Sequence, residues 1–211
     1  SVTERYCDLE TTGLEYTNES IASISFTTEI DKEIYSIAFL TIPKEMWWNA
    51  DLGDGEIREA LQKVFVHPID FHDGLFDIRF LWKAGFQVNY NFDTADAHLM
   101  VDENSPHNMR YLISIYNKFG QLTHKNAFAE LGFQEGEYHK GPAELLLKIN
   151  IDDTYHGYLL KGKFQELMKK EKTDAFFKKI QMPFKRVLAK MSYRGIMMDR
   201  ERIHSTSAKY R

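Results

Sequence analysis

Asp8 and Glu10 are the two residues of this sequence whose type and spacing are best suited to chemistry. One residue separates them, and alternate residues of a β-strand point to the same face of a sheet. Two carboxylates side by side repel each other unless a cation lies between them, and hard oxygen ligands favour Mg²⁺ or Mn²⁺. The pair therefore predicts a divalent metal site on a strand. A solvated acidic strand edge is the alternative that so short a pattern leaves open.

The elements that must position this pair can be predicted from the surrounding residues. Polar turn residues follow at 11–13, then an alternating segment at 21–26 and an apolar run at 34–42. This pattern predicts a meander of three strands within residues 4–42, with the acidic pair on the first strand. Further along the chain, the residue pattern and the family resemblance described next predict helices at about residues 55–66, 76–84, 94–118 and 141–170.

Residues 8–14, with the sequence DLETTGL, resemble the first exonuclease motif of the 3′–5′ proofreading domains in family A DNA polymerases, the DNA polymerase I type. These domains belong to the DEDD superfamily, which is named after four metal-binding acids. The resemblance implies a second acid where a helix begins, and Asp77 stands there, with Gly85 following the helix as a C-terminal glycine. It implies a last acid on a later helix, a place that Asp153 matches. The metal-binding and catalytic residues implied are Asp8, Glu10, Asp77 and Asp153.

Two further landmarks extend the resemblance. A Phe-Asp-Thr sequence at 92–94 should open a helix, and Asp93 is interpreted as its N-cap, a position that Asp fills well, in preference to a catalytic role. Residues 181–199 resemble the segment that leads from exonuclease to polymerase, in which a helix ends at a glycine and the chain turns into Ile-x-x-Asp. The resemblance implies an exonuclease domain at 1–178 and the truncated start of a thumb-side polymerase region at 179–211.

The fold implied is an α/β, ribonuclease H-like 3′–5′ exonuclease fold: a mixed sheet flanked by helices, with an added C-terminal helical segment. A length of 211 residues with 43% hydrophobic content agrees with one such domain and a tail. Trp47 and Trp48 are adjacent in the segment 45–54. We expect them to cover the sheet, and contact with a polymerase domain is the alternative.

The chemistry implied is hydrolysis with two metal ions, Mg²⁺ or Mn²⁺, about 4 Å apart. One ion would lower the pKa of the attacking water, and the other would stabilise the leaving 3′ oxygen. Asp8 is expected to bridge both ions. Glu10 and Asp153 would lie on the nucleophile side, and Asp77 on the other side, partly through water.

The resemblance also implies contacts with the substrate. Thr11 and Leu14 match positions that meet the 3′-terminal nucleotide, with the leucine wedged against the last base. Phe128 stands where the family places an aromatic that stacks on a base, a contact worth about 1–3 kcal/mol; a core position is the favoured alternative. Asp73, also on the substrate side, replaces the usual asparagine of the family. Its extra carboxylate should either bind metal or raise the pKa of a neighbour.

The residues around Asp153 depart from the family. The family has a tyrosine four residues earlier, which orients the attacking water, whereas this chain has Ile149. The sister branch has a histidine five residues earlier, whereas this chain has Lys148. His156, one helical turn after Asp153, is a possible base, with a partly exposed surface histidine as the alternative, and Tyr155 should point elsewhere. These changes predict a slower enzyme, because general-base assistance contributes about 10²–10⁴-fold.

Charge is distributed unevenly along the chain. The formal net charge is −4, but the two halves differ. Residues 1–104 carry 20 acidic and 7 basic side chains, whereas residues 105–211 carry 11 acidic and 20 basic side chains. The basic half can attract phosphate. The densest basic stretch, 161–179, is interpreted as the solvated face of a helix, with DNA contact as the alternative.

Composition also bears on the compartment. The single cysteine, Cys7, excludes an internal disulfide and is expected to be a buried core thiol in a reducing compartment. No apolar run approaches the roughly 18 residues that cross a bilayer, and the polar N-terminus shows no signal peptide. We therefore expect no membrane association and a location in the cytoplasm, in a host cell if the protein is viral, or in an organelle, without secretion.

Three functions follow from these features. The first is a metal-dependent 3′–5′ exonuclease that proofreads single-stranded DNA 3′ ends or frayed primer termini, with the polymerase domain of the same longer protein as its partner. The second is a weakened or inactive domain that binds DNA 3′ ends and supports the polymerase, as Ile149 suggests. The third is a ribonuclease D-like 3′ exoribonuclease, which the polymerase-like segment 181–199 argues against. A hydrolase of other substrates would require the motif matches to be coincidental.

Overall fold

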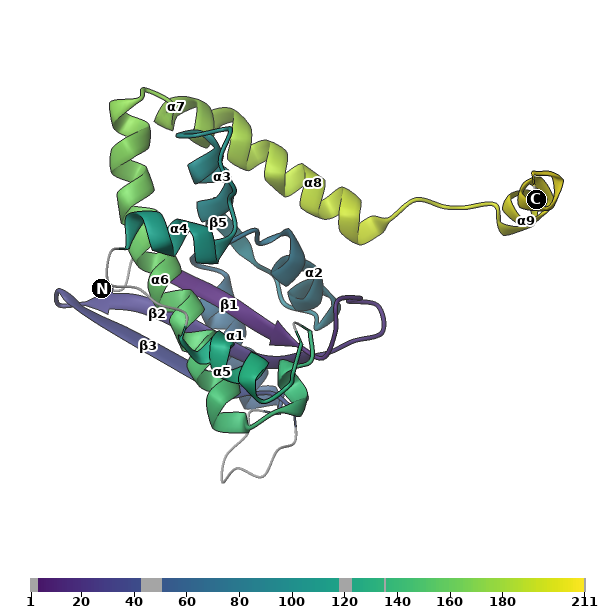
Figure 1. Ribbon diagram of the computed structural model, residues 1–211, viewed down its shortest axis with the longest axis horizontal. Coiled ribbons are helices and arrows are strands. Elements are labelled where there is room, and N and C mark those ends of the chain that lie inside the picture. The colour runs from purple at the N-terminus through teal and green to yellow at the C-terminus, as the bar shows by residue number, and fades with distance from the viewer. Residues whose placement is uncertain (1–3, 43–50, 118–122, 135, 211) are drawn as a thin grey trace.

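The computed structural model describes residues 4–42, 51–117, 123–134 and 136–210. Trp47 and Trp48, expected to cover the sheet, lie outside these residues. Figure 1 shows a central sheet with helices on both sides and a C-terminal helix that lies apart from this body. In the part of the chain that the structure describes, no helix is long and apolar enough to cross a membrane.

Five strands of the described chain form one mixed sheet. β1 (Arg5–Thr11), β2 (Ile21–Ile30) and β3 (Glu33–Leu40) form an antiparallel meander, which confirms the prediction. β4 (Pro68–Phe71) pairs in parallel with β1, and β5 (Asn89–Asp93) pairs in parallel with β4. The strand order is β3-β2-β1-β4-β5, so β1 with its acidic pair lies at the centre of the sheet.

The two faces of β1 differ in their packing. Cys7 and Leu9 point into the larger hydrophobic cluster, which also includes Phe65 of helix α1 (Gly55–Phe65). Cys7 is fully buried, as expected of a core thiol. On the other face, β1 presents Tyr6, Asp8 and Glu10 opposite the small residues Thr27, Ser25 and Ser23 of β2. Helix α6 (Ala143–Lys170) packs over this polar face.

The predicted helices are confirmed with one exception. α1, α2 (Leu75–Lys83) and α6 lie where they were expected, and Gly85, with a φ of 87°, follows α2. The single helix predicted at 94–118 is wrong, because the structure has α3 (Thr94–Leu99) and α4 (Met109–Tyr116) with a loop between them.

The loop between α3 and α4 has a local cause. The Asp102 carboxylate accepts hydrogen bonds from the N–H of Asn104 and the hydroxyl of Ser105, which is the turn chemistry of an aspartate. Pro106 then lacks the N–H that a continuing helix would need. The remaining helical elements are α5 (Thr123–Glu130), the 3₁₀ helix η1 (Tyr138–Lys140), α7 (Asp174–Phe176), the π-helix η2 (Phe177–Gln181), α8 (Met182–Arg194) and α9 (Arg200–Lys209).

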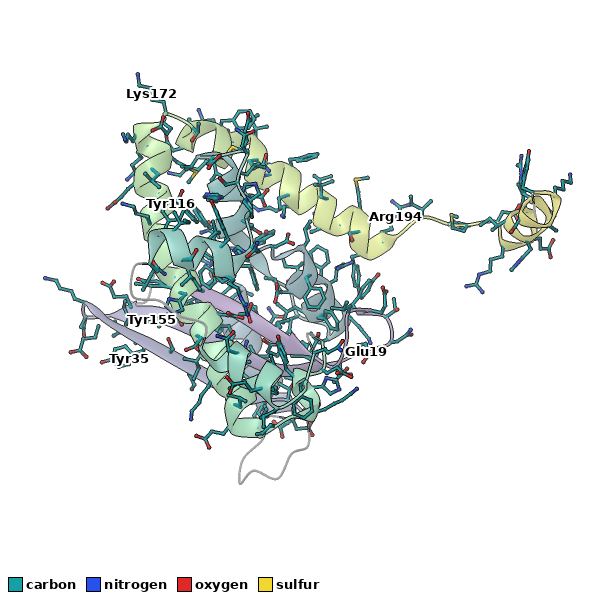
Figure 2. The ribbon with its side chains drawn as sticks, in the orientation of Figure 1. Glu19, Tyr35, Tyr116, Tyr155, Lys172 and Arg194 are labelled. Atoms are coloured by element: carbon teal, nitrogen blue, oxygen red, sulfur yellow. The ribbon has the colours of Figure 1, made fainter. Side chains whose placement is uncertain are left out.

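The two C-terminal helices have different surroundings. α8 packs against α2 and β5 and buries Met182, Lys185 and Ala189. It ends at Arg194, and Gly195, with a φ of 68°, begins the extended segment that leads to α9 (Figure 2). None of the α9 side chains is buried. Of these two helices, only α8 is therefore part of the packed body.

The basic stretch at 161–179 begins with a buried residue. Lys161 is 2% exposed, and its Nζ lies 2.6 Å from Asp70 Oδ2 and 3.1 Å from Glu4 Oε2. Burial raises the pKa of the Asp70 carboxyl, and the Lys161 charge opposes that rise. The pair connects α6 to β4, so both the solvated-face interpretation and the alternative of DNA contact are wrong for Lys161.

Candidate metal centre

Three carboxylates converge between β1 and α6. One carboxylate oxygen from each of Asp8, Glu10 and Asp153 lies within 4.8 Å of the other two. β1 presents the first two on one face, and α6 packs on that face and supplies the third. Asp153 is buried, and the two strand residues are half-buried. Three oxygen donors at this separation fit a hard divalent cation such as Mg²⁺ or Mn²⁺.

Asn150 holds Asp8 in place. Its side-chain N–H₂ donates to Asp8 Oδ2 at 2.8 Å. The Ser23 hydroxyl donates to Asn150 Oδ1 at 3.1 Å, so the amide is itself oriented, and the Ser25 hydroxyl donates to the backbone carbonyl of Asn150 at 2.8 Å. No sequence motif pointed to Asn150. The available signal was its position one helical turn before Asp153, which puts both side chains on one face of α6.

Replacing Asn150 tests this role. We expect Asn150→Ala to weaken Mn²⁺ binding and nuclease activity by about 10–100-fold, because groups that orient a metal ligand typically contribute this much. Calorimetric Mn²⁺ titration and a nuclease assay measure the two effects. Ser23→Ala is the milder control, since it removes one of the bonds to Asn150 and leaves the bond to Asp8. Unchanged metal affinity in Asn150→Ala would refute the role.

Gly157 permits α6 to approach β1 closely. A Cβ at this position would lie 2.3 Å from two ring atoms of Tyr6, which is fully buried. The Tyr6 hydroxyl lies 2.7 Å from the Thr94 hydroxyl, and His72 Nδ1 lies 2.9 Å from the same oxygen. The tyrosine ring therefore cannot move aside easily, and the glycine sets the distance between α6 and the acids of β1.

The predicted fourth acid, Asp77, lies outside the group of three. It is in the first turn of α2, 4% exposed, and its Oδ1 accepts a hydrogen bond from the N–H of Leu9 at 3.1 Å. Burial raises its pKa well above the usual range, and the charges of Asp73 and Asp93 raise it further. The charge of Asp73 thus acts on a neighbouring acid, which agrees with one of the two alternatives for this residue. Direct metal binding by Asp77 stays a prediction.

Asp93 organises the loop that precedes α2. Its carboxylate accepts hydrogen bonds from the N–H groups of Ala95 and Asp96, which confirms the N-cap interpretation. It also accepts from the N–H groups of Asp73 and Gly74 at 3.2 and 2.9 Å. Asp73 has a φ of 49°, a backbone conformation that is uncommon outside glycine. One carboxylate thus fixes both the start of α3 and the turn that holds Asp73.

A cavity of about 740 Å³ opens beside the acidic group. Its lining includes Asp8, Asp73, His107, Arg110, Tyr138 and Asp153. The acids come from the metal-centre side, whereas His107 precedes α4, Arg110 is in the first turn of α4, and Tyr138 is in η1. Acidic and basic groups in one cavity can bind a cation and a phosphate together. No sequence motif pointed to His107, Arg110 or Tyr138, because these residues become neighbours of the acids only through the fold.

The proposed substrate residues have different environments. Leu14 is 67% exposed, and the buried Thr11 donates its hydroxyl to the carbonyl of Gly13 at 2.7 Å. Phe128 is fully buried, with its ring centroid 4.8 Å from that of Tyr138. Its assignment as a stacking platform is wrong, because no face of the ring is open to a base, and the core interpretation is confirmed.

His156 is buried and does not line the cavity. Asn117 Nδ2 lies 3.3 Å from its Nδ1. Burial lowers the pKa of the imidazole, and the nearby charges of Asp152 and Asp153 oppose this shift. The alternative of a partly exposed surface histidine is wrong, and a role as a base stays a prediction. Tyr155 is 39% exposed on α6 (Figure 2).

The two positions that depart from the family also have clear environments. Ile149 is fully buried in a small hydrophobic cluster with Phe128 and Leu146. Lys148 is directed to an ion pair with Glu144 at 2.6 Å. Neither residue supplies a hydroxyl or an imidazole to the acidic group.

A mixed five-stranded sheet with α6 across the face that carries the acids is an α/β fold of the ribonuclease H-like type, as predicted. No family model matches the chain. The chain is 29% identical over 128 residues to DNA polymerase I of Borreliella burgdorferi, a match that covers 60% of this chain and 14% of that protein. The chain therefore spans a small part of that relative.

Solved structures share the fold. The POL domain of Pol1 from M. smegmatis, in complex with DNA primer-template and dNTP, matches with a TM-score of 0.68 and 13% identity, over 99% of this chain and 31% of that chain. NrnC of Brucella melitensis bound to pGG matches with a TM-score of 0.66 and 16% identity, over 92% of this chain and 87% of that chain. NrnC with bound Mg²⁺ matches with a TM-score of 0.60 and 16% identity, over 94% of this chain and 90% of that chain. The resemblance to DNA polymerase I is confirmed over part of the chain, and the fold is shared with solved nuclease structures.

Proposed function

We propose that the chain is a metal-dependent 3′–5′ exonuclease domain that acts on single-stranded or frayed DNA 3′ ends as the proofreading part of a DNA polymerase. The proposal rests on the convergence of Asp8, Glu10 and Asp153 beside a cavity that also contains His107 and Arg110. The partial match to DNA polymerase I supports the polymerase context.

The acids would hold two divalent ions. Asp8, Glu10 and Asp153 would bind one, and Asp8 with Asp77 would bind the other. Mg²⁺ and Mn²⁺ suit oxygen donors, and the Mg²⁺-bound structure of NrnC supports Mg²⁺. When bound, the ions would activate water and offset the charge that develops on the phosphate and on the leaving 3′ oxygen.

The other residues of the cavity would orient the substrate. Arg110 and His107 offer hydrogen-bond donors to a phosphate next to the one that is cleaved. The exposed Leu14 would contact the last base, and Thr11 would contact the terminal nucleotide, as the family resemblance implies. Asn150 would keep Asp8 oriented toward the metal through its 2.8 Å hydrogen bond.

A DNA oligonucleotide labelled at its 5′ end tests the proposal, with RNA of the same sequence alongside, in Mg²⁺ and in Mn²⁺. Stepwise shortening of the DNA from the 3′ end, stopped by a chelator, is the expected result. Shortening of the RNA alone would overturn the proposal in favour of the ribonuclease D-like alternative.

A weakened or inactive domain that binds DNA 3′ ends is the second candidate. The buried Ile149 favours it, because this position then contributes no hydroxyl to orient a water molecule. Loss of general-base assistance slows a reaction by about 10²–10⁴-fold without removing the metal ligands. Metal-dependent binding of the oligonucleotide without any shortening would select this candidate.

The polymerase region of a longer protein is the partner that we propose. Residues 1–178 would form the exonuclease unit, and 179–211 would begin the thumb-side region. On α8, Phe184, Val187 and Met191 are 54%, 53% and 62% exposed, and their spacing of three and four residues places them on one face of the helix. A following polymerase domain would cover this apolar face.

A further inference from the structure

Lys185 is a buried cation surrounded by three carboxylates. It lies on α8 and is 8% exposed. Its Nζ lies 2.6 Å from Asp96 Oδ2, 3.1 Å from Asp73 Oδ1 and 3.8 Å from Asp93 Oδ2. The lysine therefore connects α8 to the turn before α2 and to the first turn of α3.

Two of these carboxylates, those of Asp93 and Asp96, have structural partners besides the lysine. Asp93 accepts four backbone N–H groups, and Asp96 accepts a hydrogen bond from Gln181 at 2.7 Å. The only described side-chain contact of Asp73 is with Lys185, and its side chain is 67% exposed. Asp73 is thus the carboxylate whose position depends most on the lysine.

Asp73 is also the one of the three that lines the cavity with Asp8 and Asp153. A carboxylate released from its lysine into the cavity of a metal centre would offer a further oxygen ligand to a divalent cation. Extra ligands change the coordination geometry on which metal chemistry depends.

We infer that Lys185 is a positioning residue that neutralises Asp73 and holds its carboxylate away from the metal centre. The inference rests on the proposed metal-dependent function. α8 thereby carries the counter-charge for Asp73, although the two residues are 112 positions apart.

The test is a double-mutant cycle of Lys185→Met and Asp73→Asn, read by Mn²⁺ titration and by the rate of oligonucleotide shortening. We expect Lys185→Met to bind Mn²⁺ about tenfold more tightly and to cut about tenfold more slowly, in the range typical of groups around a metal ligand. Lys185→Met combined with Asp73→Asn should return both values to those of Asp73→Asn alone. Lys185→Arg should keep the wild-type values, because the positive charge remains.

Two controls separate positioning from stability. Lys190→Met removes an exposed lysine of the same helix and should change neither value. Thermal unfolding shows whether each variant is folded at the assay temperature. If Lys185→Met slows cutting and Asp73→Asn does not restore the rate, or if Mn²⁺ affinity is unchanged, the inference is overturned. If the wild-type chain cuts nothing, the proposed function fails, and the Mn²⁺ cycle alone decides the role of Lys185.

Discussion

Asp8→Ala should lower the rate of 3′-end shortening by about 10³-fold or more, because several kcal/mol of metal-derived stabilisation depend on this ligand and each 1.36 kcal/mol corresponds to a factor of ten. Asp8 lies in the group of three and is held by Asn150. It is also the residue expected to contact both ions. The measurement is the rate of shortening in Mg²⁺ and in Mn²⁺ at saturating DNA.

Two further variants separate this effect from misfolding. Asp8→Asn keeps the shape of the side chain and removes its charge, so it should lose nearly as much activity while its unfolding temperature stays close to that of the wild type. Asp152→Asn changes a carboxylate next to Asp153 that is not in the group of three, and it should keep the wild-type rate. Equal activity of Asp8→Ala and the wild type would exclude the proposed centre.

The part of the site on β1 could be predicted because it depends on local geometry. Asp8 and Glu10 share a face through the two-residue period of a strand, and the structure places both in the group of three. Asp153 was assigned by resemblance, since no local rule brings residue 153 next to residue 8. Their contact depends on how α6 crosses β1.

The errors have specific physical causes. The helix predicted at 94–118 ignored the turn formed by Asp102 and the missing N–H of Pro106, although both were visible in the sequence. The family motif places Phe128 at the substrate, but the ring is buried in the core, as the favoured interpretation predicted.

Buried lysines could not be predicted from the sequence. Lys161 and Lys185 lie in basic or mixed segments that resemble solvated helix faces. Their partners, Asp70 and Asp73, are 91 and 112 residues away. Burial of a lysine requires a carboxylate partner, and only the tertiary fold supplies it.

The approach of α6 to β1 provides the second large prediction. Gly157→Ala should lower the free energy of unfolding by about 3 kcal/mol, at the upper end of the cost of overpacking a core. The added Cβ would lie 2.3 Å from ring atoms of Tyr6, and the bond between the Tyr6 and Thr94 hydroxyls restrains that ring. For a chain of this size the melting temperature should fall by about 6–12 °C. Thermal unfolding measures this change.

The same substitution should also reduce metal binding, because relief of the clash requires α6 to move away from the face that carries Asp8. Asp153 lies four residues before Gly157 on α6 and would move with it. Gly162→Ala is the matched control: nothing lies within 4 Å of its added Cβ, and alanine favours a helix by about 1 kcal/mol over glycine. It should stabilise the protein and leave Mn²⁺ affinity unchanged. If both variants behave alike, the close contact at Gly157 does not set the distance between Asp8 and Asp153.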